Sequence, residues 1–327
     1  MKKEKKYLGF DIGGTKIAIC IGDDKGNILA SDRVVNSDRN PEDVIKDMIN
    51  SAKNMLCDCS ISESDISAIG IGAPGPADLQ KGILLASPNM KKWDNIHLKD
   101  IISENFKSKV YFDNDANAGA LAEWLFGVGQ GRKNIIYLTM STGIGGGIIS
   151  EGVLLRGRNL LAGELGHVVL NPKGPACNCG LRGCYEAYCG GKAISQRILS
   201  DLSGQPDHPI MKIAANDKSK IGYPALIEAV KLKNGYALSL WDEICLRNSQ
   251  AIGIFINIFN PEMIIMGTIA VAAGNLLIEP LKKLLPRFAW TQMMKDIELK
   301  TTSLGNKIGE YSGISIAKYY SESADSH

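Results

Sequence analysis

Four residues with metal-ligating side chains lie close together in the middle of the chain. His167 is followed by Cys177, Cys179 and Cys184 in the pattern His-x9-Cys-x-Cys-x4-Cys. One imidazole and three thiolates make a closed tetrahedral set for zinc, with no open position at which water could be activated. The alternative is four reduced, partly buried residues in a glycine-rich loop. The spacing favours a structural Zn²⁺, with the nearby Cys189 as a bystander.

Two glycine-rich turns each follow an apolar run. The first is Asp11-Ile12-Gly13-Gly14-Thr15-Lys16, and the second is Thr142-Gly143-Ile144-Gly145-Gly146-Gly147. Either one alone is typical of a hairpin turn that needs positive φ. The first is not a Walker A loop, because Lys16 follows Thr15 instead of preceding a Ser or Thr. Two turns with bare backbone N–H groups could hold a polyphosphate from both sides, so the pair favours a nucleotide site.

A polar segment, Phe112-Asp113-Asn114-Asp115-Ala116-Asn117, ends an apolar run and opens a helical one. Its Asp and Asn residues could be helix caps. The carboxyl end of a strand is also where α/β folds place reactive groups. The residues of this segment leave the two interpretations open.

The elements that position these residues indicate α/β lobes. Each glycine-rich turn joins two strands of a hairpin, which suggests one unit used twice. The stretch after residue 192 is expected to be mainly helical. We expect strands at 7–12, 17–21, 66–71, 135–140, 147–150 and 263–266, and helices at 41–55, from 115, and at 309–320.

The composition of the 327 residues is that of a globular protein of about two domains, with 45% hydrophobic and 22% charged residues. A net charge of +2 gives no electrostatic footprint for nucleic acid. The apolar run after the basic N-terminus is too short for a signal peptide. The most hydrophobic later stretch is interrupted by Asn257, Asn260 and Pro261, which is not typical of a membrane span. We therefore expect a cytoplasmic protein without a membrane span, in which clustered cysteines bind metal.

With these segments in hand, the chain resembles the ROK family of bacterial sugar kinases and sugar-responsive repressors, nearly from end to end. The resemblance implies an α/β, two-lobed actin/hexokinase-like fold of duplicated ribonuclease H-like domains, with an interlobe active-site cleft. The lobes would span 1–118 plus 305–327, and 119–304. The matching segments are the two glycine-rich turns, Pro74-Gly75-Pro76, Ser87-Pro88-Asn89, Asn114-Asp115-Ala116-Asn117, Ala162-Gly163-Glu164-Leu165-Gly166-His167 and the cysteine cluster with Glu186.

By this resemblance Asp115 is the general base that takes the proton of a hexose 6-hydroxyl as that oxygen attacks ATP. His167 would bind Zn²⁺ through one ring nitrogen and sugar through the other. Asp11 would orient a hydrated Mg²⁺. The implied sugar contacts are Gly75, Asn89, Asn114, Asp115, Glu164, His167 and Glu186, and the implied ATP contacts are Asp11, Gly13, Gly14, Thr15, Lys16, Thr142, Gly143 and Gly267.

Two departures from the family pattern bear on function. Gly267 is followed by Thr268, where family members usually carry a second glycine, so nucleotide preference is open. About ten residues precede Asp11, where the family's repressors carry a DNA-binding segment. Glucose is the expected hexose, with N-acetylmannosamine or fructose, or sugar sensing without turnover, as alternatives. A homodimer or homotetramer is expected by resemblance.

Overall fold

The computed structural model describes residues 4–86 and 90–324. The chain forms two compact units. Unit 1 comprises Met1–Gly131, Arg156–Ala162 and Ser303–His327, and unit 2 comprises Arg132–Leu155 and Gly163–Thr302. The chain therefore leaves unit 2 twice, at Arg156 and at Ser303. Within the described residues, no helix is both long and apolar enough to cross a membrane.

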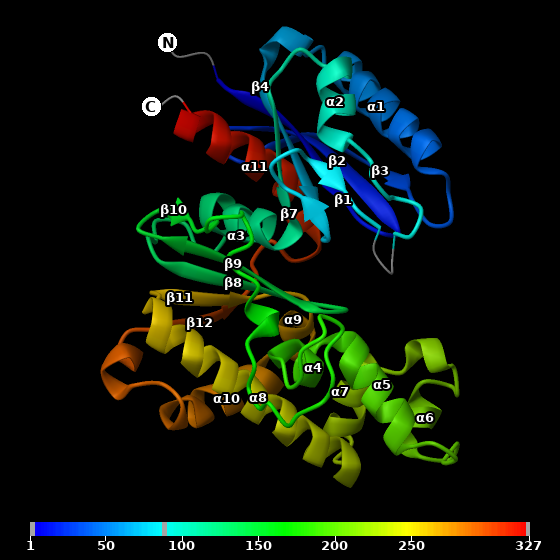
Figure 1. The fold of residues 1–327 in the computed structure, drawn as a ribbon, viewed down its shortest axis with the longest axis vertical. Helices are drawn as coiled ribbons and strands as arrows, with labels where there is room; N and C mark the ends of the chain where they lie inside the picture. The colour runs from blue at the N-terminus through cyan, green and yellow to red at the C-terminus, as the bar shows by residue number, and fades with distance from the viewer. Residues whose placement is uncertain (1–3, 87–89, 325–327) are drawn as a thin grey trace. The chain divides into compact units, whose positions relative to one another are not determined.

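Unit 1 is built on a five-stranded mixed sheet of order β3-β2-β1-β4-β7 (Figure 1). The first three strands are antiparallel neighbours, whereas β4 and β7 run parallel to β1. The strands are β1 Lys6–Ile12, β2 Lys16–Asp23, β3 Ile28–Val35, β4 Ile66–Ala73 and β7 Val110–Asn114, with a small pair β5 Ala77–Asp78 and β6 Ile83–Leu84. The helices are α1 Pro41–Asp58, α2 Leu98–Asn105, α3 Asp115–Phe126 and α11 Ile308–Ala324.

Helix α1 shows why these segments fold as they do. Asn40 caps its first turn by accepting a hydrogen bond from the Glu42 N–H, and Pro41 occupies the first helical position. Its apolar residues recur every three to four positions, so one face is buried in the unit 1 core. Each large side chain buried there contributes about 1.5–3 kcal/mol relative to exposure.

Helix α11 lies directly on the backbone of the unit 1 sheet, where Figure 1 shows it in red against the blue strands. A Cβ added to Gly70 of β4 would lie 2.0 Å from the carbonyl oxygen of Gly313 in α11. A Cβ added to Gly313 would lie 2.4 Å from the backbone nitrogen of Phe10 in β1. Only glycine permits this approach, and it brings α11 to the strand that ends in Asp11.

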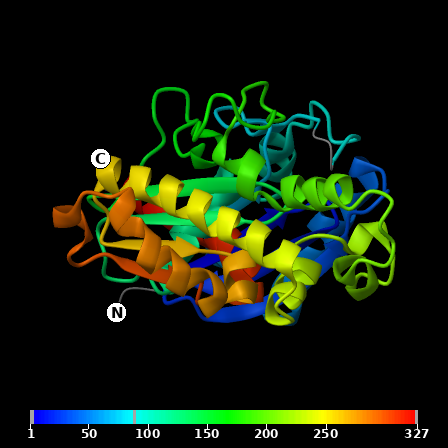
Figure 2. The same ribbon diagram turned by 90° about the horizontal axis from the view of Figure 1, so that it is seen from below.

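Unit 2 repeats the strand order and directions of unit 1 in its sheet β10-β9-β8-β11-β12. Its long helix α8 packs beside α10, in yellow and orange in Figure 2. The strands are β8 Ile135–Met140, β9 Ile144–Ser150, β10 Val153–Leu154, β11 Met263–Met266 and β12 Glu298–Thr301. The helices are α4 Tyr185–Cys189, α5 Gly191–Asp201, α6 Pro209–Ile213, α7 Tyr223–Lys231, α8 Gly235–Phe259, α9 Ile269–Ala273 and α10 Asn275–Leu284.

The structure confirms the predicted elements and the repeated unit. The strands expected at 135–140 and 263–266 have the predicted bounds. Both hairpins are present, and their other strands, β1, β2 and β9, are longer than predicted. The helices expected at 41–55, from 115 and at 309–320 are present as α1, α3 and α11. Strand β3 was not predicted, because its Ser31-Asp32-Arg33 centre interrupts the apolar pattern.

Candidate functional site

The first glycine-rich turn joins β1 to β2 and is held by a side chain from the end of β3. The Asn36 side-chain amide donates to the Gly13 carbonyl at 2.7 Å, and its Oδ1 accepts from the Trp93 indole N–H at 3.0 Å. A Cβ added to Gly13 would lie 2.7 Å from the carbonyl oxygen of Lys16. Gly13 is therefore required by close backbone approach, and both Gly13 and Gly14 are only partly buried.

Asp11 lies near the C-terminal end of β1, close to the backbone of α11 and of β4. A Cβ added to Gly309 of α11 would lie 2.6 Å from one Asp11 carboxylate oxygen, and one added to Gly72 of β4 would lie 3.5 Å from the other. Burial raises the pKa of the Asp11 carboxyl from 3.8 to about 7, and the charge of Asp115 adds to this rise while Lys16 opposes it. Asp11 is therefore an acid that titrates near neutral pH.

The junction of β7 and α3 presents Asn114 and Asp115. The Asn114 side-chain oxygen accepts from the Asn117 N–H at 2.7 Å and so caps α3. Asp115 is the first residue of α3, and it is exposed. An exposed carboxylate at the end of a strand can meet a substrate hydroxyl, which suits a proton acceptor. Gly75 is exposed beyond β4, whereas Asn89 lies outside the described residues.

The second glycine-rich turn, between β8 and β9, contacts a carboxylate from α4. Glu186 accepts a hydrogen bond from the Ile144 N–H at 2.8 Å. A Cβ added to Gly143 would lie 2.4 Å from the same Glu186 oxygen, so a larger residue here would displace the Glu186 carboxylate. A Cβ added to Gly166 would lie 2.0 Å from the Ile144 carbonyl oxygen, which brings the Glu164–His167 segment against the turn. The Lys192 N–H donates to the Thr142 carbonyl at 2.9 Å.

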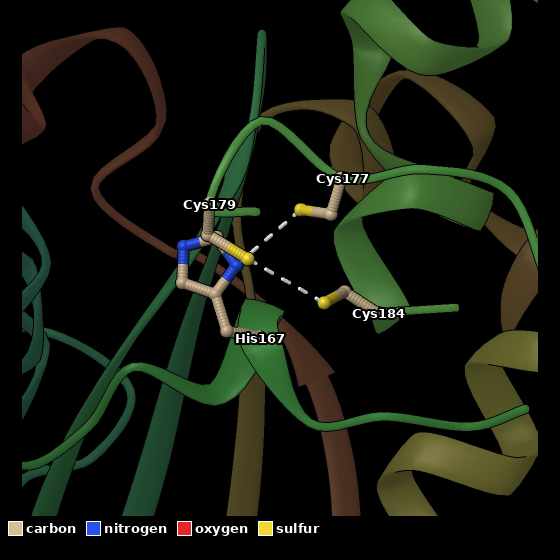
Figure 3. A group of neighbouring side chains, drawn as sticks. All are labelled: His167, Cys177, Cys179 and Cys184. Carbon is tan, nitrogen blue, oxygen red and sulfur yellow. Dashed lines mark hydrogen bonds between the residues drawn. The ribbon is translucent and has the colours of Figure 1, made fainter. Parts of the chain in front are cut away.

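The four predicted metal ligands come together, as Figure 3 shows. Their ligand atoms all lie within 4.8 Å of one another. The Cys179 and Cys184 sulfurs are 3.7 Å apart, and the Cys177 sulfur is 3.6 Å from His167 Nδ1. Zn–S bonds of about 2.3 Å in a tetrahedron separate two sulfurs by about 3.8 Å. The residues therefore fit a zinc ion, and His167 points Nδ1 at the cluster.

The loop around the cluster is wound tightly enough to need glycine. Gly183 has a φ of +71°, and an added Cβ would lie 1.6 Å from the Asn171 carbonyl oxygen. Burial raises the pKa of the Cys184 thiol to about 12. The Leu181 backbone lowers the pKa of the Cys179 thiol. Cys189 packs elsewhere, where its sulfur accepts from the Asn248 side chain at 3.4 Å.

Gly267 follows β11, and its N–H donates to the Leu138 carbonyl at 2.8 Å. The next residue, Thr268, has a φ of +28°. A β-branched side chain rarely adopts this conformation, for which glycine is the favoured residue. Thr268, which stands where the family usually has glycine, therefore occupies a backbone conformation that favours glycine.

Two sets of residues at the site could not be found by sequence reasoning. Asn36 stands after an unpredicted strand, and only its position next to a strand end distinguishes it from a surface residue. The buried Asp113 contacts Arg156 and Tyr320, which lie far away in the sequence. The spacing of these residues carries no periodic or motif signal.

Comparison with known proteins places the chain among sugar-phosphorylating enzymes. A glucokinase from Thermotoga maritima is 34% identical over 313 residues, covering 96% of this chain and 97% of that protein. A ROK hexokinase from Thermus thermophilus has a TM-score of 0.84 at 30% identity and covers 98% of this chain and 99% of its own. A ROK glucokinase from Streptomyces griseus, solved with glucose and AMPPNP, has a TM-score of 0.75 at 29% identity, with coverage of 96% and 99%.

The likeness to these solved structures confirms the predicted α/β fold of the actin/hexokinase type. The family model for the ROK family matches residues 7–318, which is nearly the whole chain. The matched region holds both glycine-rich turns, the Asn114-Asp115 junction and the cysteine cluster. The chain belongs to the ROK family.

Proposed function

We propose that this protein is an ATP-dependent hexokinase whose substrate is glucose. The observation that carries the proposal is Asp115 at the start of α3, beside Asn114 and in the same unit as the first glycine-rich turn. Names of near full-length relatives support glucose as the sugar. The Streptomyces griseus structure with glucose and AMPPNP, an ATP analogue, supports ATP as the donor.

In this proposal Asp115 accepts the proton of the sugar 6-hydroxyl as that oxygen attacks the γ-phosphorus of ATP. The bond from the γ-phosphorus to the bridging oxygen breaks, and ADP leaves. The carboxylate suits this role because it is exposed directly after the end of β7, where a substrate hydroxyl can reach it. Further sugar contacts come from Gly75, Asn89, Asn114, Glu164, His167 and Glu186.

By the family resemblance, each glycine-rich turn would supply backbone contacts to ATP, at Gly13 and Gly14 in unit 1 and at Thr142 and Gly143 in unit 2. Asn36 keeps the first turn fixed, and Glu186 does the same for the second. Preorganised N–H groups of this kind stabilise the charge of a transferring phosphoryl group. Mg²⁺ supplies charge neutralisation when it is bound with ATP, and Asp11 would orient its water ligands. Gly267 would lie at the adenosine side.

We further propose that His167, Cys177, Cys179 and Cys184 hold a structural zinc ion. A closed set of four ligands leaves zinc no position for substrate, so its chemistry is to fix the protein around it. Fixing His167 also fixes the Glu164–His167 segment, which packs on the Ile144 backbone through Gly166. The metal would thereby order the sugar-facing residues and the second turn together. A homodimer or homotetramer in the cytoplasm remains a proposal by family resemblance.

The test is a coupled assay of ADP release with ATP and Mg²⁺. The sugars are glucose, mannose, fructose, N-acetylglucosamine and N-acetylmannosamine. Glucose-dependent release supports the proposal, and preference for another sugar keeps the mechanism but changes the substrate. Silence with all five sugars, while glucose binding is measurable by calorimetry, would favour a sugar sensor without turnover.

Asp115→Asn tests the proton acceptor. We expect kcat to fall at least ~10²-fold with glucose binding largely kept, because the variant loses a general base but no side-chain volume. Asp100→Asn is the matched control, since Asp100 also lies in the first turn of a helix, α2, and we expect it to keep full activity. Turnover by Asp115→Asn close to that of the native protein would remove Asp115 from the mechanism.

A further inference from the structure

The carboxylate of Asp113, two residues before the proposed base, is completely buried and surrounded by hydrogen-bond donors. One oxygen accepts from the Asn114 N–H and from the Asn117 side-chain amide, both at 2.8 Å. The other accepts from the Tyr320 hydroxyl and lies 3.4 Å from Arg156 Nε. Burial of a carboxylate costs free energy unless such partners compensate it.

The two partners of the outer oxygen come from different parts of the chain. Arg156 is the first residue of the segment Arg156–Ala162, with which the chain enters unit 1 from unit 2, and Tyr320 lies in α11. The Arg156 guanidinium packs over the Tyr320 ring, 5.0 Å from its centroid. Burial and the charge of Asp113 raise the pKa of Tyr320 far above its usual range. Tyr320 therefore donates its proton to Asp113 throughout the pH range of an enzyme assay.

The inner oxygen of Asp113 holds the backbone on both sides of Asp115. The Asn114 N–H lies just before the base, and the Asn117 amide lies half a turn after it. The Asn114 side chain in turn accepts from the Asn117 N–H at 2.7 Å. A change in the position or charge of Asp113 would therefore be transmitted through two hydrogen bonds to the residue that must meet the sugar hydroxyl.

We propose that Arg156 and Tyr320 are positioning residues for Asp115, acting through the buried carboxylate of Asp113. This inference depends on the proposed function only for the role of Asp115. The geometry extends over unit 1 alone, since Arg156, Asp113 and Tyr320 all belong to it. Neither partner needs to touch sugar or nucleotide for its loss to slow the reaction.

Variants of Arg156 and Tyr320 test the proposal by steady-state kinetics. We expect Arg156→Met to lower kcat about 10²-fold and Tyr320→Phe about 10-fold, because small displacements of a catalytic group reduce rates by such factors. The KM for ATP should change less than about 3-fold, since the nucleotide contacts are intact. Arg156→Lys should recover part of the rate, because it restores the charge but not the planar group that packs over the Tyr320 ring. Arg247→Met is the matched control, because the Arg247 guanidinium also packs over a tyrosine ring, 4.4 Å from the Tyr188 centroid, but in unit 2.

A double variant separates positioning from loss of packing. With Arg156 replaced by Met, the Asp113 carboxylate is left without its cation. Asp113→Asn removes that charge and keeps an oxygen for the Asn114 N–H. We therefore expect the double variant Arg156→Met with Asp113→Asn to turn over faster than Arg156→Met alone. If the single Arg156→Met protein does not fold, Arg156→Lys, Tyr320→Phe and the double variant still give the comparison.

Amide hydrogen exchange gives a readout that needs no activity. Arg156→Met should speed exchange at residues 114–117 by about 10-fold or more and leave β8 and β9 of unit 2 unchanged. If the native protein turned over no sugar, the proposed function would be refuted. Hydrogen exchange at residues 114–117 would still test whether Arg156 holds the backbone around Asp115. Normal kcat and normal exchange in both Arg156→Met and Tyr320→Phe would overturn the positioning role, even with Asp115→Asn inactive. So would an Arg156→Lys rate as low as that of Arg156→Met.

Discussion

Replacing Asp11 by Asn should change how the stability of the protein depends on pH. Burial by Gly72 and Gly309, and then the charge of Asp115, raise the pKa of Asp11 from 3.8 to about 7. Between these two values the folded protein keeps a proton that the unfolded chain has released. The free energy of unfolding of the native protein therefore falls as pH rises through this window. Asn has nearly the shape of the protonated acid and does not titrate, so the variant escapes this loss.

The size of the effect follows from the shift in pKa. One pH unit corresponds to about 1.36 kcal/mol, so a shift of about three units sets an upper bound of about 4 kcal/mol. Asp11 is only partly buried, and solvent screening reduces the difference to about 2 kcal/mol. At pH 5 only part of this loss has developed, and above pH 7 it is complete. Asp11→Asn should thus gain about 1–2 kcal/mol over the native protein between pH 5 and pH 7.5.

Urea unfolding of both proteins at several pH values, without Mg²⁺ or nucleotide, measures this gain. Asp32→Asn is the matched control. The Ser51 hydroxyl and the Arg33 N–H lower the pKa of Asp32, so its contribution to stability is constant above pH 5. The difference between Asp32→Asn and the native protein should therefore not vary with pH. A similarly constant difference for Asp11→Asn would refute the reasoning about its burial.

Two further predictions concern the metal cluster and the backbone after β11. Elemental analysis should find about one zinc per chain, and Cys184→Ser should lose it and raise the KM for glucose, whereas the exposed Cys57→Ser should keep both. A metal-free protein with a normal KM would contradict the ordering role of zinc. Thr268→Gly should raise the free energy of unfolding by about 1 kcal/mol, because release of strain at a φ of +28° outweighs the added freedom of the unfolded chain. Thr301→Gly, in the regular strand β12, should lower it, and destabilisation by Thr268→Gly in the same urea titrations would show that Thr268 is not strained.

Much of the fold could be predicted because its signals are local. The apolar runs that form β8 and β11 have the predicted bounds, since β11 is buried along its whole length and β8 at every residue except Thr139. Strand β3 is half exposed at the sheet edge, and its polar centre breaks the apolar pattern from which a strand could be predicted. The cysteine cluster was predictable because three ligands lie within eight consecutive residues, and closely spaced soft ligands have few other uses.

Other parts of the site depend on contacts that no spacing shows. Asp113 looks like one polar residue among several before a helix, and its partner Tyr320 is 207 residues away. The role of Asn36 could not be predicted for a similar reason, because its contact with Gly13 exists only once β3 has paired with β2. Glycine posed a different problem: the sequence left open whether Gly13 and Gly143 serve a turn or a close approach. The contacts with Lys16 and Glu186 show close approach at both.

The end of β7 and helix α3, which follows it, contact both segments with which the chain enters unit 1 from unit 2. Asp113 of β7 forms an ion pair with Arg156, the first residue after Leu155. Farther along, the buried carboxylate of Glu123 accepts from the N–H groups of Ser303 and Leu304, at 3.0 and 3.1 Å, where the chain enters unit 1 again. Both carboxylates are fully buried, so neither contact can be lost cheaply. The helix that begins with the proposed base is thus fixed, at Asp113 just before it and at Glu123 within it, to the two segments that connect unit 2 to unit 1. Substitutions in these contacts can alter turnover without touching a substrate.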